Sequence, residues 1–111
     1  IERNFPSEAD AAHVHAMAMD WRDPIDGASP LHGAFQFAFA SDVTHATVRY
    51  AELFRTAYSL LGKGGHFLMI NHMWIYFAPD GCNAGAAAGF KVLKEIQIPG
   101  ESFMLTVFEK P

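Results

Sequence analysis

The chain has 111 residues, of which 50% are hydrophobic and 18% are charged, and its formal net charge is -4. These values are typical of one globular domain with a real core, and they exclude a disordered segment. The negative balance gives no basic field for nucleic acid. The longest apolar run, residues 67–78, is too short and too polar to span a membrane. The single cysteine, Cys82, excludes an internal disulfide and predicts a reducing compartment, the cytoplasm.

The first third of the chain predicts one strand and one loop. Residues 1–12 are polar, and Pro6 interrupts any helix that begins before it. Residues 13–21 alternate in hydrophobicity with the period of a strand, which we expect to end at Asp20. Residues 22–33 carry two prolines and two glycines and therefore predict a loop.

Residues 34–70 carry the most informative pattern of the chain. Residues 34–40 are apolar on both faces, which predicts a strand in a sheet that is covered on both sides. Residues 46–61 show the apolar spacing of a helix that lies on a sheet, and residues 66–77 predict a second strand. Two short apolar strands flanking one helix predict a parallel βαβ unit. In such sheets, ligands bind at the carboxyl ends of the strands, where Asp42 follows the first strand.

The polar residues of the helix and its end are expected to serve structural roles. Arg49, Glu52 and Arg55 fall on the solvent side of the helix, where they form weak ion pairs. Gly62 is well placed to cap the C-terminus of the helix, since glycine adopts the left-handed conformation at low cost.

The last third of the chain predicts an antiparallel hairpin. Residues 84–88 indicate a short helical turn, and residues 90–98 and 102–109 are strand-like. Pro99 and Gly100 between them suit the centre of a type II turn. We therefore expect residues 1–111 to form a single α/β domain.

The ordered set of motifs resembles the C-terminal half of class I S-adenosylmethionine-dependent methyltransferases. It consists of a strand ending in Met-Asp-Trp, the strand FQFAFASDV, a helix, a Lys-Gly-Gly turn, a further strand and the segment AGFKVLKEIQIPGESFMLTVFEK. The resemblance implies a Rossmann-like methyltransferase sheet with its last strand inserted antiparallel, which agrees with the hairpin. Asn4 and the run from Met19 to Asp23 are similar to the branch that contains many protein-lysine methyltransferases.

The resemblance also implies that the chain is a partial domain that lacks the first two strands of the family. Those strands carry a glycine-rich loop for the cofactor and an acidic residue for its ribose. The cluster Lys63-Gly64-Gly65 leads into a strand and cannot present a helix N-terminus to a ligand, so we interpret it as a turn. The isolated chain is accordingly expected to be inactive.

Four residues are implied to contact the cofactor, S-adenosylmethionine. Asp20 and Trp21 would contact the adenine, and the backbone at Ala40 and Ser41 would line the cofactor. The structural alternative for Asp20 and Trp21 is a solvated carboxylate followed by an indole that covers the sheet edge.

Asp42 and His45 are implied to face the methyl acceptor as catalytic residues. A carboxylate at Asp42 can orient an amine or take its proton, although Asp42 can also cap the following helix. His45 occupies a position where the lysine-methylating branch often has tyrosine, which leaves the acceptor open between a protein and a small molecule. Asn71 and His72 end the next strand and either face the acceptor or form a hydrogen-bonded pair.

Other chemistry is not expected from this sequence. His13 and His15 share a strand face but have no third ligand at a recognisable spacing, so no metal site is predicted. Cys82 lacks any sign of an activated thiolate.

The sequence therefore leads to two main hypotheses and a weaker third. The first is methyl transfer from S-adenosylmethionine to a nucleophile, with a protein lysine as one candidate. The second is a non-catalytic truncated or split domain that completes its sheet with a partner chain, or self-associates, through the edge beside Phe35–Phe39. The third is a fragment of another Rossmann-like enzyme such as a reductase, against which the terminal hairpin argues.

Overall fold

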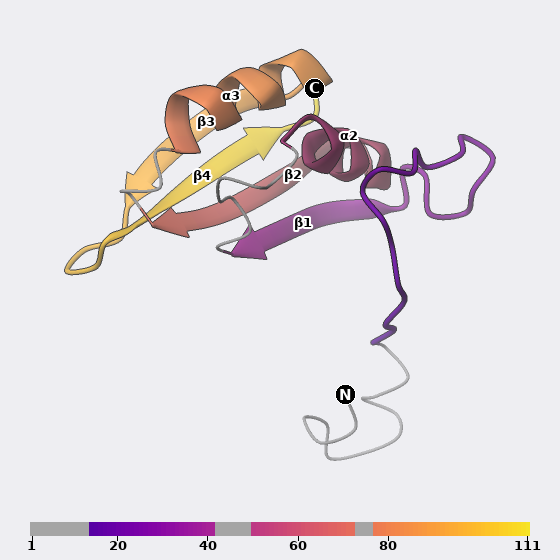
Figure 1. Cartoon of the computed structure of the whole chain (residues 1–111), viewed down its shortest axis with the longest axis horizontal. Helices are drawn as coiled ribbons and strands as arrows, with labels where there is room; N and C mark the ends of the chain where they lie inside the picture. Colours follow the sequence, from indigo (N-terminus) through magenta and orange to yellow (C-terminus); the bar gives the residue numbers. More distant parts are fainter. Residues whose placement is uncertain (1–13, 42–49, 73–76) are drawn as a thin grey trace.

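The structure is a computed structural model that describes residues 14–41, 50–72 and 77–111, without the side chains of residues 77–80. Over these residues the chain forms a four-stranded sheet and two helices (Figure 1). In chain order the elements are β1 (Phe35–Ser41), α2 (Tyr50–Leu60), β2 (Leu61–His72), α3 (Phe77–Ala88), β3 (Lys91–Gln97) and β4 (Phe103–Glu109).

The sheet combines a parallel pair with an antiparallel hairpin. Its strand order is β1-β2-β4-β3, with β1 parallel to β2 and both β2–β4 and β3–β4 antiparallel. The α/β class, the parallel βαβ unit and the terminal hairpin predicted from the sequence are therefore confirmed. In the hairpin turn, the amide of Glu101 donates to the carbonyl of Ile98 at 3.2 Å, and Gly100 has a φ of 76°. This geometry confirms the predicted type II turn, because its third position requires positive φ.

Both helices lie on the same side of the sheet, and the core lies beneath them (Figure 1). Phe54 of α2 is fully buried, and its ring meets those of Phe67 and Phe108 edge-on at 5.7 Å and 4.9 Å. Along β2, Phe67 and Met69 are buried on the helix side, whereas their neighbours are half-exposed. The 3.6-residue apolar period of the helix thus meets the two-residue period of the strand across one interface.

The opposite face of the sheet is uncovered by any other described element. On β1, Phe37 and Phe39 are 66% and 85% exposed, although they are large apolar side chains. The sequence predicted a sheet covered on both faces, and the described residues cover only one. The apolar side chains of this uncovered side form the bare face: Phe35, Phe37, Phe39, Leu68, Ile70, Ile96, Phe103, Leu105 and Val107.

The strand predicted at residues 13–20 is absent from the described part, residues 14–20, which have no regular structure and are mostly exposed. An alternating pattern forms a strand only where a neighbouring strand accepts its backbone hydrogen bonds. In the described sheet, β1 and β3 are the edge strands, and residues 14–20 pair with neither of them. The prediction failed because sequence alternation specifies a half-buried surface and does not supply the neighbour.

Lys110, not Gly62, satisfies the carbonyls at the end of α2. The helix ends at Leu60, and Gly62 already belongs to β2, which begins five residues earlier than the predicted start at His66. The ammonium of Lys110 donates to the carbonyls of Tyr58 and Leu61 at 2.8 Å and 2.7 Å, and it lies 4.3 Å from the centre of the Tyr58 ring. A cation at this end also complements the helix dipole. The prediction for Gly62 was wrong because this cap comes from a residue distant in sequence.

Helix α3 is longer than the turn predicted at residues 84–88, and β2 ends at His72 rather than at Phe77. At its end, Gly89 has a φ of 110°. The amide of Gly89 donates to Ala86, and the amide of Phe90 donates to Gly85, both at 3.0 Å. This pair of bonds is a Schellman motif, which explains why a helix rich in glycine ends cleanly.

Removing the Lys110 ammonium should destabilise the fold. Lys110→Met leaves two carbonyls without their charged donor, so we expect the free energy of unfolding to fall by about 1–3 kcal/mol in urea titrations. The matched control is Lys63→Met, because Lys63 is exposed and its loss should change stability by less than about 0.5 kcal/mol. Equal stability of the two variants would contradict the capping role.

Candidate active site

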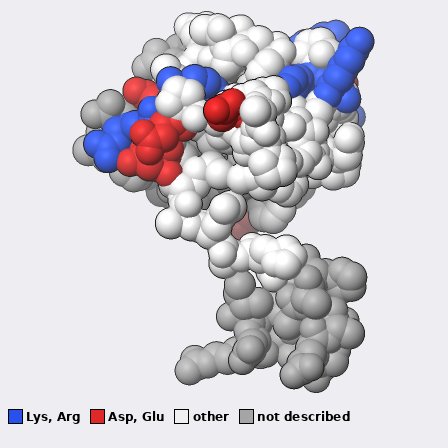
Figure 2. Space-filling model, turned by 90° about the vertical axis from the view of Figure 1, so that its right-hand side faces the viewer, with Lys and Arg blue, Asp and Glu red and all other residues white. Residues whose placement is uncertain are grey.

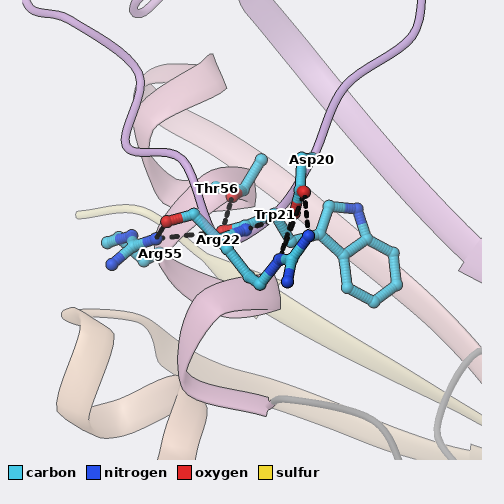
Figure 3. A network of polar contacts seen from close by, with 5 residues as sticks. All are labelled: Asp20, Trp21, Arg22, Arg55 and Thr56. Carbon is cyan, nitrogen blue, oxygen red and sulfur yellow. Dashed lines mark hydrogen bonds and ion pairs between the residues drawn. The ribbon is translucent and has the colours of Figure 1, made fainter.

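A compact polar network holds the turn formed by residues 20–23 (Figure 3). The Asp20 carboxylate accepts hydrogen bonds from the side chain of Arg22, the shortest being 2.7 Å from Nη2, and from the Arg22 amide at 2.9 Å. These contacts raise the pKa of Arg22, mainly through the hydrogen bond to Asp20. Both side chains are largely exposed, so the pair orders the turn more than it stabilises the fold.

Helix α2 holds the same turn from the other side. Arg55 Nη2 donates to the carbonyls of Trp21 at 2.9 Å and Arg22 at 3.1 Å, and the Thr56 hydroxyl donates to the carbonyl of Trp21 at 3.4 Å (Figure 3). The Trp21 indole is half-buried and packs against the hydrophobic core. The turn therefore presents the Asp20 carboxylate outward while the backbone behind it is fixed to α2.

Arg55 and Thr56 were not expected in this position. The helical spacing predicts Arg55 on a solvent face with weak ion pairs, whereas in the structure it donates to two backbone carbonyls. The residues it joins lie more than 30 positions away in the sequence. Helical periodicity describes only the faces of one helix and carries no signal for such a contact.

The carboxyl ends of the parallel pair form the second part of the candidate site. Ala40 is half-buried against the core, and Ser41 is exposed at the end of β1, opposite Ile70 of β2. Asp42 and His45, the predicted catalytic residues, lie outside the described residues. The predicted cofactor roles of Asp20, Trp21, Ala40 and Ser41 stay predictions.

The end of β2 extends this edge towards the hairpin. Asn71 is buried on the helix side of the sheet, at 3% exposure. His72 points to the other side, opposite Phe103 of β4, with 4.2 Å between the ring centres. The two residues that the sequence treated as one strand-end pair are thus separated by the sheet, because successive side chains of a strand alternate faces.

A cavity of about 600 Å³ lies at the opposite, amino end of β1. Figure 2 views the molecule from the right-hand side of Figure 1; the charged side chains gather in its upper part, and the described atoms below them are mostly uncharged. The cavity has a nearly uncharged apolar lining, made of Val14, His15, Met17, Met19, Leu31, Phe35 and Leu60. It offers no donor set for the polar groups of a nucleoside and is distinct from the carboxyl edge.

The described part of the chain contains neither a candidate metal site nor a candidate membrane-spanning helix. Among the described residues no group of three His, Cys, Asp or Glu side chains is arranged to hold a metal ion. Neither of the described helices has the length and hydropathy of a membrane span.

Cys82 of α3 is a partly buried thiol. Its Sγ lies 3.5 Å from Oε1 of Glu95 on β3. Burial, followed by the hydrogen bond and the charge of Glu95, raises the pKa of Cys82 to about 11. A thiol with a raised pKa is a poor nucleophile at neutral pH, so Cys82 is not a catalytic candidate.

Comparison with known proteins identifies the fold. The sequence matches no protein-family model and no curated protein. Several solved structures that resemble the chain are S-adenosylmethionine-dependent methyltransferases, so the described sheet has the fold of part of such a domain. This confirms the expected partial Rossmann-like methyltransferase sheet.

Three of these structures illustrate the similarity. The geranyl diphosphate C-methyltransferase from Streptomyces coelicolor, solved with Mg²⁺, geranyl diphosphate and S-adenosyl-L-homocysteine, has a TM-score of 0.70 at 11% identity, with 90% of this chain and 55% of that chain covered. An S-adenosylmethionine-dependent methyltransferase from Mesorhizobium loti gives 0.59 at 18% identity, with 70% and 63% covered. The N-methyltransferase NodS from Bradyrhizobium japonicum, solved with S-adenosyl-L-homocysteine, gives 0.55 at 14% identity, with 69% and 46% covered. The chain therefore matches less than two thirds of each of these proteins.

Arg55→Met should loosen the Asp20–Arg22 turn and expose Trp21. The chain has two tryptophans, so the measurement uses a Trp74→Phe background in which Trp21 is the only emitter. Because the variant loses the donors to two carbonyls, we expect red-shifted emission and stronger acrylamide quenching. Arg22→Met is the matched control, since it removes the ion pair but keeps the backbone carbonyl of residue 22, and it should change the Trp21 emission much less than Arg55→Met. Unchanged emission in Arg55→Met would contradict the arrangement.

Cys82 should react slowly in the folded chain. With a pKa of about 11, the thiolate fraction at pH 8 is about 100-fold below that of an ordinary thiol, and iodoacetamide alkylation should slow at least as much relative to the chain in urea. Glu95→Gln removes the neighbouring charge and should speed the reaction, whereas Glu101→Gln should not. Equal rates in the folded and unfolded chains would contradict this environment.

Proposed function

We propose that the chain is part of an S-adenosylmethionine-dependent methyltransferase and provides the acceptor side of its active site. The observation that carries this proposal is the sheet β1-β2-β4-β3, a parallel pair followed by an antiparallel hairpin, in a fold that resembles methyltransferases solved with S-adenosyl-L-homocysteine. The antiparallel hairpin of β3 and β4 argues against the reductase alternative.

In this proposal the cofactor lies across the carboxyl ends of the parallel strands. Trp21 and Asp20 border the adenine, with the Asp20 carboxylate accepting from the exocyclic amine. This needs no change of backbone, because Arg55 and Thr56 already hold the turn. A carboxylate has about four acceptor sites, so Asp20 can accept a further bond while Arg22 stays in place. Ala40 and Ser41 line the middle of the cofactor.

The reaction transfers a methyl group from the sulfonium to a nucleophile of the acceptor. The carbon–sulfur bond breaks as the new bond forms, the sulfonium becomes a thioether, and the acceptor gives its proton to a base. Asp42 and His45 follow β1 directly and are the proposed catalytic residues, with Asp42 orienting the nucleophile or accepting the proton. Most of the rate enhancement in such a transfer comes from holding the methyl donor and the acceptor in line. Few side chains therefore have to take part chemically. The acceptor is left open between a protein, with a lysine as one candidate, and a small molecule.

The remaining cofactor contacts are proposed to come from polypeptide beyond the described residues. This chain covers 63%, 55% and 46% of the three similar structures. At least 37% of each of those proteins therefore has no counterpart in this chain. In keeping with this, no glycine-rich loop precedes a helix within the described sheet.

A second candidate function is a non-catalytic domain that completes its sheet with another chain. The exposed Phe37 and Phe39 favour it, since soluble domains rarely leave such side chains uncovered. Cofactor binding discriminates between the candidates, because a purely structural domain has no reason to recognise S-adenosyl-L-homocysteine at Asp20 and Trp21.

The isolated chain should bind the cofactor weakly. We expect isothermal titration of the 111-residue chain with S-adenosyl-L-homocysteine to give a Kd above about 1 mM, since the groups that hold the ribose and methionine end are not in the described sheet. Circular dichroism establishes that the chain is folded under the same conditions. Micromolar binding would contradict the proposal that half of the site lies elsewhere.

The reading frame upstream of Ile1 provides the complementary test. We expect it to encode an apolar strand followed by a glycine-rich loop and a helix, and the product that includes it should bind S-adenosyl-L-homocysteine at micromolar Kd. In that product Asp20→Ala and Trp21→Ala should weaken binding about 10-fold or more, whereas Asp26→Ala in the exposed loop should not. A frame that lacks the strand and loop would refute the methyltransferase proposal.

A further inference from the structure

Arg22 connects helix α2 with the carboxylate of Asp20 through three separate groups. Its backbone carbonyl accepts a hydrogen bond from Arg55 Nη2 at 3.1 Å. Its backbone amide donates to Asp20 Oδ1 at 2.9 Å, and its Nη2 donates to Asp20 Oδ2 at 2.7 Å. The amide of Asp23, which donates to the Asp20 carbonyl at 3.0 Å, closes the same turn. One residue therefore joins the carboxylate to the helix behind it.

The side chain of Arg22 fixes the plane of this carboxylate, which the backbone contact alone does not. The amide holds only Oδ1, and the last side-chain torsion of an aspartate is broad, so Oδ2 can turn about that single contact. The guanidinium contacts both oxygens, with Nε 3.1 Å from each and Nη2 2.7 Å from Oδ2 (Figure 3). A forked contact of this kind defines an orientation as well as a distance. Arg22 thus sets the directions in which the oxygens of Asp20 accept hydrogen bonds.

This pair is better suited to orienting a ligand than to stabilising the fold. The side chains of Arg22 and Asp20 are 65% and 42% exposed, so a ligand can reach the carboxylate. An exposed ion pair contributes little to the free energy of unfolding, because water screens it. The backbone behind the pair is held independently by Arg55 and Thr56, which donate to the Trp21 carbonyl. The fork can therefore be removed while the turn stays in place.

We propose that Arg22 is a positioning residue that makes the Asp20 carboxylate selective for a 6-aminopurine over a 6-oxopurine. The inference rests on the proposed function, in which this carboxylate accepts from the exocyclic amine of the adenine. The amine donates hydrogen bonds, whereas the carbonyl of a 6-oxopurine accepts them and is repelled by a carboxylate that faces it. A carboxylate without the fork can turn away from that carbonyl and accept from the neighbouring ring N–H instead. The fork therefore acts by rejecting the wrong base as well as by binding the right one.

Adenosine and inosine differ at this position of the base and provide the test. Each is titrated at millimolar concentration into the isotope-labelled 111-residue chain, and the Trp21 indole signal gives the dissociation constants. The unchanged chain should bind adenosine about fivefold more tightly than inosine, which is a modest ratio because the carboxylate is partly exposed. Arg22→Met should reduce the ratio below about twofold, and Arg22→Lys should give an intermediate ratio, because a lysine makes a point contact without a fork. A purely structural role of Arg22 would weaken both nucleosides equally and leave the ratio unchanged.

Two further variants separate this inference from the proposed function. Lys94→Met removes an exposed cation on β3 and is the matched control, which should keep the ratio of the unchanged chain. Asp20→Asn keeps the size of the side chain but can donate to a carbonyl, so it should remove the preference for adenosine. A preserved ratio in Arg22→Met, with the preference lost in Asp20→Asn, would overturn the role of Arg22 and leave the proposed function standing. A preserved ratio in Asp20→Asn, or no shift of the Trp21 indole with either nucleoside, would overturn both.

Discussion

The burial of Phe54 is the interaction on which the arrangement of the sheet depends. Its ring is fully buried and contacts Phe67 of the parallel pair, Phe108 of the hairpin and Phe90 between them. Gly85 of α3 lies so close that an added Cβ would be 2.7 Å from the Phe108 ring, so this helix can pack only with glycine there. Because one residue of α2 contacts both the parallel and the antiparallel parts, the carboxyl edge of the sheet is fixed relative to the hairpin.

The elements that could be predicted from the sequence are those specified by residues close together in the chain. The parallel unit and the Pro99-Gly100 turn follow from periodicity and from the φ preferences of proline and glycine, and the structure confirms both. The cap by Lys110 and the contact of Arg55 with the turn at Trp21 could not be predicted, since each joins residues about 30 to 50 positions apart. The strand predicted before Asp20 failed for a related reason, because a strand requires a partner that its own sequence does not contain.

The candidate site shows the same difference between what the sequence predicts and what only the structure reveals. Its chemistry was inferred from a resemblance, and the structure confirms the fold that the resemblance implied. The structure also shows that the turn at Asp20 is hydrogen-bonded to α2. This helix follows β1 and the proposed catalytic segment in the chain. The two parts of the site therefore share one rigid helix. By contrast, the bare face lies on the side of the sheet opposite α2 and α3. The cytoplasmic location inferred from the lone cysteine stays a prediction.

The central claim is that S-adenosylmethionine binds across the carboxyl edge of β1 and β2 beside the Asp20–Arg22 turn. Nuclear magnetic resonance of the isotope-labelled chain, titrated with millimolar S-adenosyl-L-homocysteine, tests it directly, because chemical shifts report binding that is too weak for calorimetry. The account predicts that the largest shifts fall on the indole of Trp21 and the amides of Ala40 and Ser41. Shifts confined to the cavity at the amino end of β1, at Leu31 and Leu60, or no shifts at all, would contradict it.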